Sequence, residues 1–599
     1  MIESRVLKLL VPSLVWLAVA VAAAGATETR FTAPGASDDF SDKLRGTSLS
    51  LEVAGRADAS PQDLVAAAQA DYARLTGVLY AAGYYGGVIS ITIDGREAAD
   101  IPPLTRLSAV NRLEITVDHG AAFTFSRASL APRAPGTDLP ENFAVGQQAR
   151  GDLVRQAARA GIDAWRRAGH AKARVAQQDL VADHRGRTLE ARLAVAPGPR
   201  LSFGTLRVKG DSRVRAERIR AIAGLPTGEV YAPDAVKDAS KRLRRTGVFR
   251  SVALQEAEQV SPGDRLDIEA KVADAKPRRA GAGIELSSQE GLTLSSFWLH
   301  RNLLGGAERF RVDGEVGGIG GDSGGIDYRL STRFDRPATF SADTGLFLVA
   351  SIEELDDRDF RERNIELGGG LTHVFSDRLT GEAGVTLRYA EIDDDLGSRT
   401  LSHLLFPARL TWDRRDDTLD PTTGTFLDLE AAPFIGLDES STGARLFADA
   451  RAYRTFGAND GVTLAARAQA GSVAGAAISD IPPGMLFFSG GAGTVRGQSY
   501  QSLAVDLGGG QRVGGRSFLG FSGEVRADVG GKFQAVAFAD TGFIGEDAWG
   551  TENGDWHSGA GLGARYATGV GPIRVDVATP LGSDAGQDFE IYIGIGQAF

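Results

Sequence analysis

The sequence contains no cysteine among its 599 residues, and only two methionines and seven histidines. The absence of cysteine excludes a disulfide framework, a thiol nucleophile and a cysteine–zinc site. The histidines are scattered and form no HExxH pair or similar metal-binding motif. The net charge of −11 argues against a general nucleic-acid binder, which would carry a basic surface. The composition thus offers no candidate metal site or nucleic-acid partner, and we expect no cofactor.

Long apolar runs are also missing, except at the N-terminus. Arg5 and Lys8 precede an apolar stretch, Leu9–Ala24, and Ala24-Gly25-Ala26 fits a small-x-small cleavage site. This arrangement predicts a cleaved signal peptide over residues 1–26, with an uncleaved membrane anchor as the alternative. No later segment has 18 or more consecutive apolar residues, so any further membrane crossing must use strands.

One local signature recurs three times in the first half of the chain. The end of an amphipathic helix is followed by Gly83, Gly169 or Gly247 and then by an extended segment, and these glycines lie 86 and 78 residues apart. A glycine at this place suits a left-handed helix cap. In the third repeat, Leu206–Gly210 supplies an opening strand, which gives the order strand–helix–helix–strand–strand. We predict three α+β modules, at residues 28–119, 120–198 and 199–275; the first has no clear opening strand.

From Lys276 onward, helical periodicity gives way to segments of about ten residues that alternate in polarity, as in a transmembrane β-barrel. Seven short turns separate these segments: Asn302–Glu308, Arg336–Gly345, Ser376–Gly381, Asp416–Gly424, Phe456–Gly461, Val529–Lys532 and Gly569–Pro572. Seven periplasmic turns and two periplasmic ends predict a barrel of sixteen antiparallel strands over residues 276–599. The gap between the fifth and sixth turns predicts a long extracellular loop, roughly Val473 to Ser517. The alternative is a soluble β-sandwich.

The last strand shows the clearest alternation of polarity. Its apolar face, expected to contact lipid, consists of Phe589, Ile591, Ile593, Ile595 and Phe599. Gly594 and Gly596 lie on the opposite face, where they provide no side-chain packing and should weaken the strand edge.

The predicted long loop contains Val495-Arg496-Gly497 within a glycine-rich stretch, Phe487–Tyr500. This segment resembles the loop motif of the Omp85 superfamily, although Gln498 stands where that family usually has an aromatic residue. Trp298–Gly306 and Trp412–Asp417 resemble two of the family's barrel turns, and the three modules resemble its POTRA domains. The terminal Phe599 resembles the assembly signal of outer-membrane proteins.

The resemblance implies that the loop folds back into the barrel lumen, where Arg496 pairs with acidic side chains of the two following strands. Glu524 and Asp540 are the candidate partners, and an arginine fork suits carboxylates. Alternation of polarity places Glu524 on the inner face of its strand. Asp540 is less clear, because apolar Val536 and Phe538 lie on the same face of its strand. The alternative is a solvated loop arginine.

Three POTRA-like modules before sixteen strands most resemble the TamA family of outer-membrane assembly factors. That resemblance implies a non-enzymatic protein with autotransporter-type clients, a TamB-like inner-membrane-anchored partner, contact with outer-membrane lipid, and POTRA-like modules in the periplasm. We predict a gate where the first strand, from about Gly281, meets the last, with Ile284 close enough to Ile593 for crosslinking. The alternatives are a passive or secretion pore of the same superfamily, a general BamA-like assembly factor, or a purely structural barrel.

Overall fold

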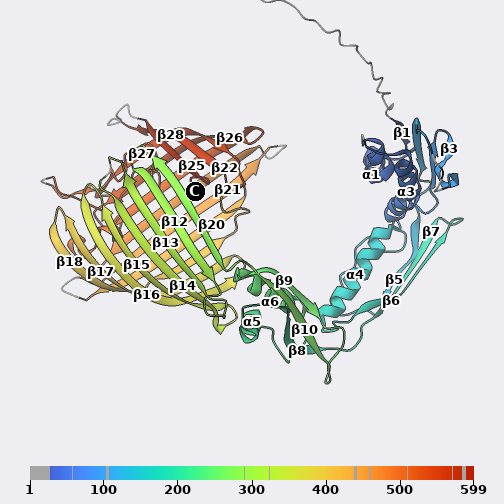
Figure 1. The fold of residues 1–599 in the computed structure, drawn as a ribbon, viewed down its shortest axis with the longest axis horizontal. Coiled ribbons are helices and arrows are strands. Elements are labelled where there is room, and N and C mark those ends of the chain that lie inside the picture. Colours follow the sequence, from blue (N-terminus) through green and yellow to red (C-terminus); the bar gives the residue numbers. More distant parts are fainter. Residues whose placement is uncertain are drawn as a thin grey trace, which may run out of the picture. The chain divides into compact units, whose positions relative to one another are not determined.

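The computed structural model describes residues 27–56, 58–102, 105, 107–288, 290–322, 324–437, 441–457, 461–508, 510–569, 571–582 and 589–599. The predicted signal peptide, residues 1–26, lies outside these ranges. Within them, no helix combines the length and the apolar character that a membrane crossing requires. The described part of the chain divides into two compact units (Figure 1), one comprising its residues up to 202 together with 230–233, and the other its residues in 203–229 and from 234 onward.

The first α+β module packs three helices against a four-stranded sheet of order β1-β4-β2-β3. Its elements are β1 (Glu28–Thr32), α1 (Asp38–Thr47), α2 (Leu49–Ala54), α3 (Pro61–Ala82), β2 (Val88–Ile93), β3 (Arg96–Glu97), the 3-10 helix η1 (Ala98–Asp100) and β4 (Arg112–Asp118). Strand β1 pairs parallel with β4 and is the opening strand that could not be recognised in the sequence.

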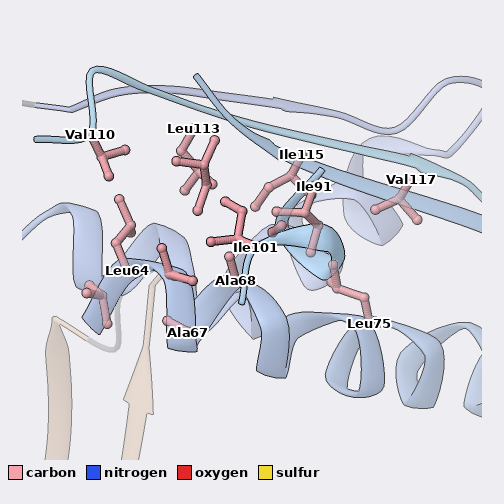
Figure 2. Packing of buried hydrophobic residues seen from close by; sticks show 14 of the residues in the cluster. Leu64, Ala67, Ala68, Leu75, Ile91, Ile101, Val110, Leu113, Ile115 and Val117 are labelled. Atoms are coloured by element: carbon pink, nitrogen blue, oxygen red, sulfur yellow. The ribbon is translucent and has the colours of Figure 1, made fainter. Parts of the chain in front are cut away.

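The core of this module lies between α3 and the sheet (Figure 2). Leu75 of α3 and Ile91 and Leu113 of the sheet are fully buried. Burial of one such side chain contributes about 1.5–3 kcal/mol. A capping box between Ser60 and Asp63 starts α3 and a left-handed Gly83 ends it, as the sequence signature predicts.

The second module is smaller and contains only one helix. It consists of β5 (Thr124–Ala131), α4 (Gly151–Arg167), β6 (Arg174–Asp183) and β7 (Thr188–Ala196), with sheet order β5-β7-β6. Turns and irregular chain occupy residues 132–150, where the third repeat predicts a helix. Pro132, Pro135 and Pro140 lie in this stretch, and proline removes the backbone donors and clashes with the preceding turn of a helix.

The third module belongs to the same compact unit as the barrel. It consists of β8 (Ser202–Lys209), α5 (Ala216–Ala223), α6 (Pro233–Arg245), β9 (Phe249–Glu256) and β10 (Arg265–Asp274), and its sheet has the order β8-β10-β9. Leu243 of α6 packs within a core that includes the fully buried Leu266 and Ile268 of β10. The strand–helix–helix–strand–strand order predicted for this module is therefore present.

The second half is a closed antiparallel barrel, as predicted. Its strands are β11 (Arg278–Ser287), β12 (Gly291–Arg301), β13 (Arg309–Ile319), β14 (Asp327–Ser341), β15 (Thr344–Asp356), β16 (Phe360–Ser376), β17 (Leu379–Asp394), β18 (Gly397–Leu405), β19 (Ala408–Asp413), β20 (Gly424–Gly436), β21 (Gly443–Phe456), β22 (Val462–Ala474), β25 (Ser517–Gly530), β26 (Phe533–Gly545), β27 (Gly554–Tyr566), β28 (Ile573–Leu581) and β29 (Glu590–Ile595).

Strands β18 and β19 form one barrel strand interrupted at Phe406 and Pro407, because both pair with β17 on one side and β20 on the other. The barrel therefore has sixteen strands, and the count made from the turns is confirmed. Each predicted short turn lies between two paired strands. We call the end of the barrel that carries these turns the turn end, and the opposite end the loop end.

The third module is docked on the turn end through its basic helices. Arg242 of α6 donates from Nε and Nη2 to the carboxylate of Asp343, over 3.0 and 2.7 Å, and Arg245 donates to the same carboxylate over 2.9 Å. Asp343 lies in the turn between β14 and β15, and the hydrogen bond from Arg242 holds its pKa below the usual value. Arg218 of α5 donates to the carbonyl oxygen of Ala338 over 3.2 Å. The turns of the barrel wall thus provide the acceptors for this module.

Candidate functional site: the lumen loop and the strand seam

The long connection between β22 and β25 crosses the lumen and is attached to opposite walls. It contains two 3-10 helices, η2 (Ile478–Asp480) and η3 (Pro483–Met485), and a small hairpin of β23 (Val505–Asp506) and β24 (Arg512–Val513). On one wall, the backbone N–H of Gly484 donates to Oε2 of Glu362 over 2.7 Å, and Arg399 donates to the carbonyl of Ser479 over 2.9 Å. Glu362 is fully buried and is paired with Arg388 of the next strand.

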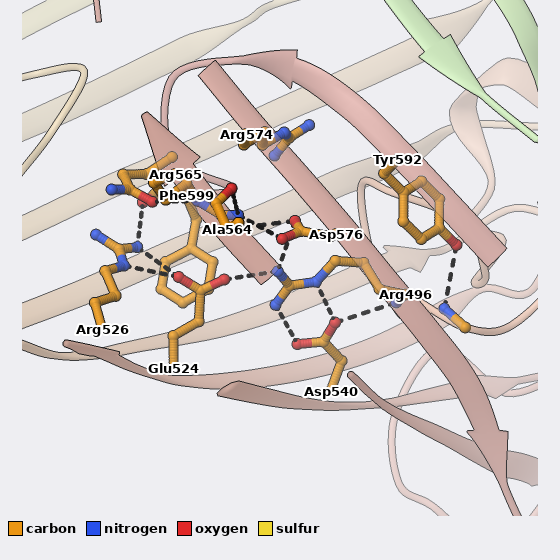
Figure 3. A network of polar contacts seen from close by, with 12 residues as sticks. Arg496, Glu524, Arg526, Asp540, Ala564, Arg565, Arg574, Asp576, Tyr592 and Phe599 are labelled. Carbon is orange, nitrogen blue, oxygen red and sulfur yellow. Dashed lines mark hydrogen bonds and ion pairs between the residues drawn. The ribbon is translucent and has the colours of Figure 1, made fainter. Parts of the chain in front are cut away.

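On the other wall, Arg496 is held by the two carboxylates predicted as its partners (Figure 3). Its Nε and Nη2 atoms donate to the Asp540 carboxylate over 2.7 and 3.0 Å, and its Nη1 donates to Oε1 of Glu524 over 2.6 Å. The backbone N–H of Arg496 also donates to Asp540, over 3.1 Å. Arg496 is only 2% exposed, so the contact excludes bulk water. The planar guanidinium satisfies both acids at once, which an ammonium could not do.

The charges around Arg496 balance. Arg526 donates to Oε2 of Glu524 over 2.8 Å, and Arg565 pairs with Asp576, whose other oxygen lies 3.6 Å from Nη1 of Arg496. Three guanidinium groups thus face three carboxylates in a buried cluster. A buried pair is costly to desolvate, and removing one partner leaves an uncompensated charge. The cluster therefore favours one position of the loop over all others.

Phe538 explains why the strand carrying Asp540 alternates poorly in polarity. The centre of the Arg496 guanidinium lies 3.6 Å from the centroid of the Phe538 ring, a cation–π contact. Val536 and Phe538 are buried on the same inner face as Asp540. This face is apolar because the loop, rather than water, covers it.

Two further residues of the loop motif contact the wall. Gly497 has φ +88°, and a Cβ there would lie 2.6 Å from the Thr579 carbonyl, so only glycine fits. Its N–H donates to the hydroxyl of Tyr592 in the last strand over 3.1 Å. Gln498, which replaces the usual aromatic residue, donates to the carbonyl of Ser558 over 2.7 Å. Val495 is fully buried.

Among the described residues, the seam between β11 and β29 is the shortest ladder that joins consecutive strands of the barrel. It comprises two residue pairs, Leu286 with Ile593 and Ser287 with Tyr592. Ile284 points outward and is 66% exposed, but it is not opposite Ile593. The prediction that these two residues form a crosslinkable pair is therefore wrong. The residue opposite Ile593 is Leu286, the next outward-facing residue of β11. Gly281 lies farther toward the turn end, where a Cβ would collide with the Phe297 ring of β12.

Side chains supplement this short ladder. Nη2 of Arg574 in β28 donates to Oε1 of Glu285 in β11 over 2.9 Å, and so bridges across the last strand. A Cβ at Gly594 would lie 3.1 Å from Nε of Arg574 and 3.6 Å from that Glu285 oxygen. Gly594 therefore gives this ion pair room to pass, beyond its expected effect on the strand edge. Nearer the loop end, Ser288 donates to Glu590 over 2.6 Å. We call the two contacts, Glu285–Arg574 and Ser288–Glu590, the seam clasp.

The lumen loop also contacts the hairpin that begins at the seam. The N–H of Ala492 donates to Glu290, between β11 and β12, over 3.2 Å, and burial raises the pKa of the Glu290 carboxyl. Together with the Gly497–Tyr592 bond, this contact joins the loop to both sides of the seam. The position of the loop and the closure of the seam are therefore coupled through direct hydrogen bonds.

The C-terminus turns into the lumen, contrary to the expectation for Phe599. Phe589, Ile591, Ile593 and Ile595 are exposed on the outer face as predicted, but Phe599 is only 7% exposed. The reason is Gly596, whose φ of +97° ends the strand. The Phe599 ring then packs beside Tyr453 and lies 5.7 Å from the guanidinium of Arg526. Phe599 thus contacts an arginine that also binds Glu524.

Comparison with known proteins matches residues 302–599 to the Omp85 superfamily domain and residues 202–273 to the POTRA domain, described as a surface antigen variable number repeat. The chain carries an Omp85 outer-membrane barrel. This superfamily comprises barrels of the insertase and secretion type. The Arg-Gly core of the loop and its acidic partners lie within the matched region.

Solved structures agree with this fold. BamA from Haemophilus ducreyi lacking POTRA domains 1–3 superposes with a TM-score of 0.63 at 14% identity, over 79% of this chain and all of that chain. CdiB from Acinetobacter baumannii gives a TM-score of 0.51 at 11% identity, over 80% of this chain and 90% of that one. At such identities, the similarity concerns the architecture of the Omp85 barrel and its preceding modules.

Sequence reasoning missed the first attachment of the loop and the seam clasp. Alternation places Glu362 and Arg388 on the inner face, but nothing in the sequence indicates that Gly484 would meet them. Arg574 and Glu285 are separated by 289 residues and belong to strands that are not neighbours. Only the closure of the barrel brings them together.

Proposed function

We propose that the chain is a non-enzymatic assembly factor that inserts or translocates autotransporter-type β-barrel proteins at the outer membrane, with its POTRA-like modules in the periplasm. The observation that carries this proposal is the edge of β11. Within the described strands, residues 278–285 of β11 have no register partner in β29. An unpaired strand edge offers backbone donors and acceptors to any incoming strand, and natural proteins normally cover it.

The same edge is held in a resting state by few contacts. Each hydrogen bond of the clasp contributes about 1.5–3 kcal/mol, because at least one partner in each is charged. Opening also breaks the short ladder, including the backbone hydrogen bond from Ser288 to Ile591. A client strand that forms several backbone hydrogen bonds with β11 would offset the loss of these few contacts. Opening at this seam therefore requires no energy source beyond the binding of the client strand. It also requires no catalytic residue.

The lumen loop supports the assembly role over a passive pore. It is attached to both inner walls, at Glu362 and at Arg496, and so obstructs the lumen at rest. A secretion pore would require withdrawal of the whole loop from the lumen. Lateral insertion requires the seam to open, with loss of at most the loop's contact to one side of it. A TamB-like partner anchored in the inner membrane would deliver clients or lipid to the POTRA-like modules. This partnership and the choice of clients rest on the family resemblance.

Reconstitution tests the proposal. An urea-unfolded autotransporter barrel is added to liposomes that contain the full chain or no protein, and its folding is followed by the heat-dependent shift of folded barrels on gels. We expect faster folding with the chain, and no steady conductance of the wild type in a planar bilayer. Client folding at the rate of empty liposomes, together with a large steady pore, would favour the secretion-pore alternative. Equal assistance to barrels of every class would favour the general BamA-like alternative.

A further inference from the structure

A basic cavity lies between the third module and the turn end of the first hairpin of the barrel, and no residue of the lumen loop lines it. Its volume is about 880 Å³, within the range of ligand sites. Arg213 precedes α5, Arg250 comes from β9, Lys276 links the module to the barrel, and Arg301 ends β12. Four cationic side chains thus meet where two folded domains join.

These cations are not neutralised by the carboxylates nearby. The cavity is also lined by Asp211 and Asp274, which leaves a net charge of +2. Asp274 is already occupied, because Ser212 and the N–H of Arg213 donate to its two oxygens over 2.7 Å each. Among the contacts of the described residues, the four cations form no ion pair. The cavity therefore favours an anion.

The surroundings indicate that this anion belongs to a lipid. Trp298, two residues before the cavity-lining His300, is 39% exposed on the outer wall. Tryptophan in this position is typical of the membrane–water interface. The adjacent turn exposes Leu304 by 65%. In His300, which lines the cavity, the buried Nδ1 atom has no hydrogen-bond partner in the described structure. Apolar surface thus lies beside unpaired cations, as a phospholipid requires.

We propose that this cavity binds the phosphate headgroup of an anionic phospholipid of the bilayer leaflet at the turn end. Arg250 and Arg301 provide planar forks that suit phosphate oxygens, and Lys276 adds a point charge. The acyl chains lie along the outer wall beside Trp298 and Leu304. The bound lipid fastens the third module to the membrane surface on the side of β12. This assignment does not depend on the proposed assembly function.

Quenching of tryptophan fluorescence tests the site. The full chain is placed in phosphatidylcholine nanodiscs containing a small fraction of brominated phosphatidylglycerol or brominated phosphatidylcholine. The signal of Trp298 is obtained by difference from a Trp298→Phe variant. We expect stronger quenching by the anionic lipid. Arg250→Gln with Arg301→Gln should weaken its apparent affinity about 30-fold, the effect of two lost cationic contacts at a membrane surface.

The matched control is Arg414→Gln with Arg454→Gln, which removes two exposed arginines elsewhere at the same barrel end, one directly after β19 and one near the end of β21. This pair should leave the quenching of Trp298 unchanged, and gel shifts on heating verify that all variants are folded. Equal quenching by the two brominated lipids, or an equal loss in the control pair, would overturn the proposal. Loss of quenching in excess phosphate but not in chloride of equal ionic strength would assign the site to free phosphate and would also overturn it.

Discussion

Replacement of Arg496 by alanine should release one attachment of the lumen loop while leaving the barrel wall folded. The substitution removes the guanidinium that binds Asp540 and Glu524. Glu524 retains Arg526, but Asp540 is left as a buried carboxylate without its cation. Breaking a buried pair in this way costs about 3–5 kcal/mol. The equilibrium between attached and released loop should therefore shift by about 10²- to 10⁴-fold.

Steady conductance in planar bilayers is the suitable assay, because a released loop uncovers the lumen. We expect Arg496→Ala to open frequently and Arg496→Lys to lie between it and the wild type, since lysine restores the charge without the fork. Glu362→Gln should enlarge the effect by loosening the other attachment. Arg454→Ala, which removes an exposed arginine near the turn end of β21, is the control. Wild-type conductance of Arg496→Ala, with the barrel intact, would refute the attachment role.

Three further substitutions test other parts of the molecule. Gly594→Val should push Arg574 away from Glu285, and the seam should then open more often. Labelling of an introduced thiol on β11 measures this opening, and unchanged labelling would contradict the seam clasp. Phe599→Ala should destabilise the barrel by about 3 kcal/mol, as loss of a buried phenyl ring does. An unaltered midpoint temperature of unfolding in a heat-shift gel would show that the inward turn of the C-terminus does not stabilise the barrel. Asp343 has a lowered pKa, so docking of the third module should be stable above about pH 4 and weaken as the pH falls below it. Hydrogen exchange in α6 measures this. Asp343→Asn should reduce the pH dependence, and the remainder belongs to Asp377, which pairs with Lys241 of the same helix.

The barrel architecture was accessible from sequence because it depends on local signals. Turn residues mark each hairpin, and alternation with a period of two marks each wall strand. The turn count is insensitive to the break at Phe406 and Pro407, which splits one strand into β18 and β19 without adding a turn. The last strand was also correctly oriented up to Ile595.

What could not be predicted depends on contacts between distant residues or on backbone geometry. The inward course of Phe599 follows from the left-handed conformation of Gly596, and alternation alone continues a strand past any glycine. The strand that carries Asp540 does not alternate cleanly in polarity, because Phe538 packs under the guanidinium of Arg496. This contact exists only after the loop has folded inward. The missing helix of the second module shows a further limit: the repeat signature marks the helix that precedes each glycine, but carries no information on residues 132–150.

The central claim is that the barrel works by opening between β11 and β29. The most direct measurement joins these strands by a disulfide between Leu286→Cys and Ile593→Cys, which face each other in the ladder. The chain has no other cysteine. We predict that the oxidised variant in liposomes does not accelerate folding of an autotransporter client, and that reduction restores the wild-type rate. Acceleration that is equal before and after reduction, with the crosslink verified on gels, would contradict the account.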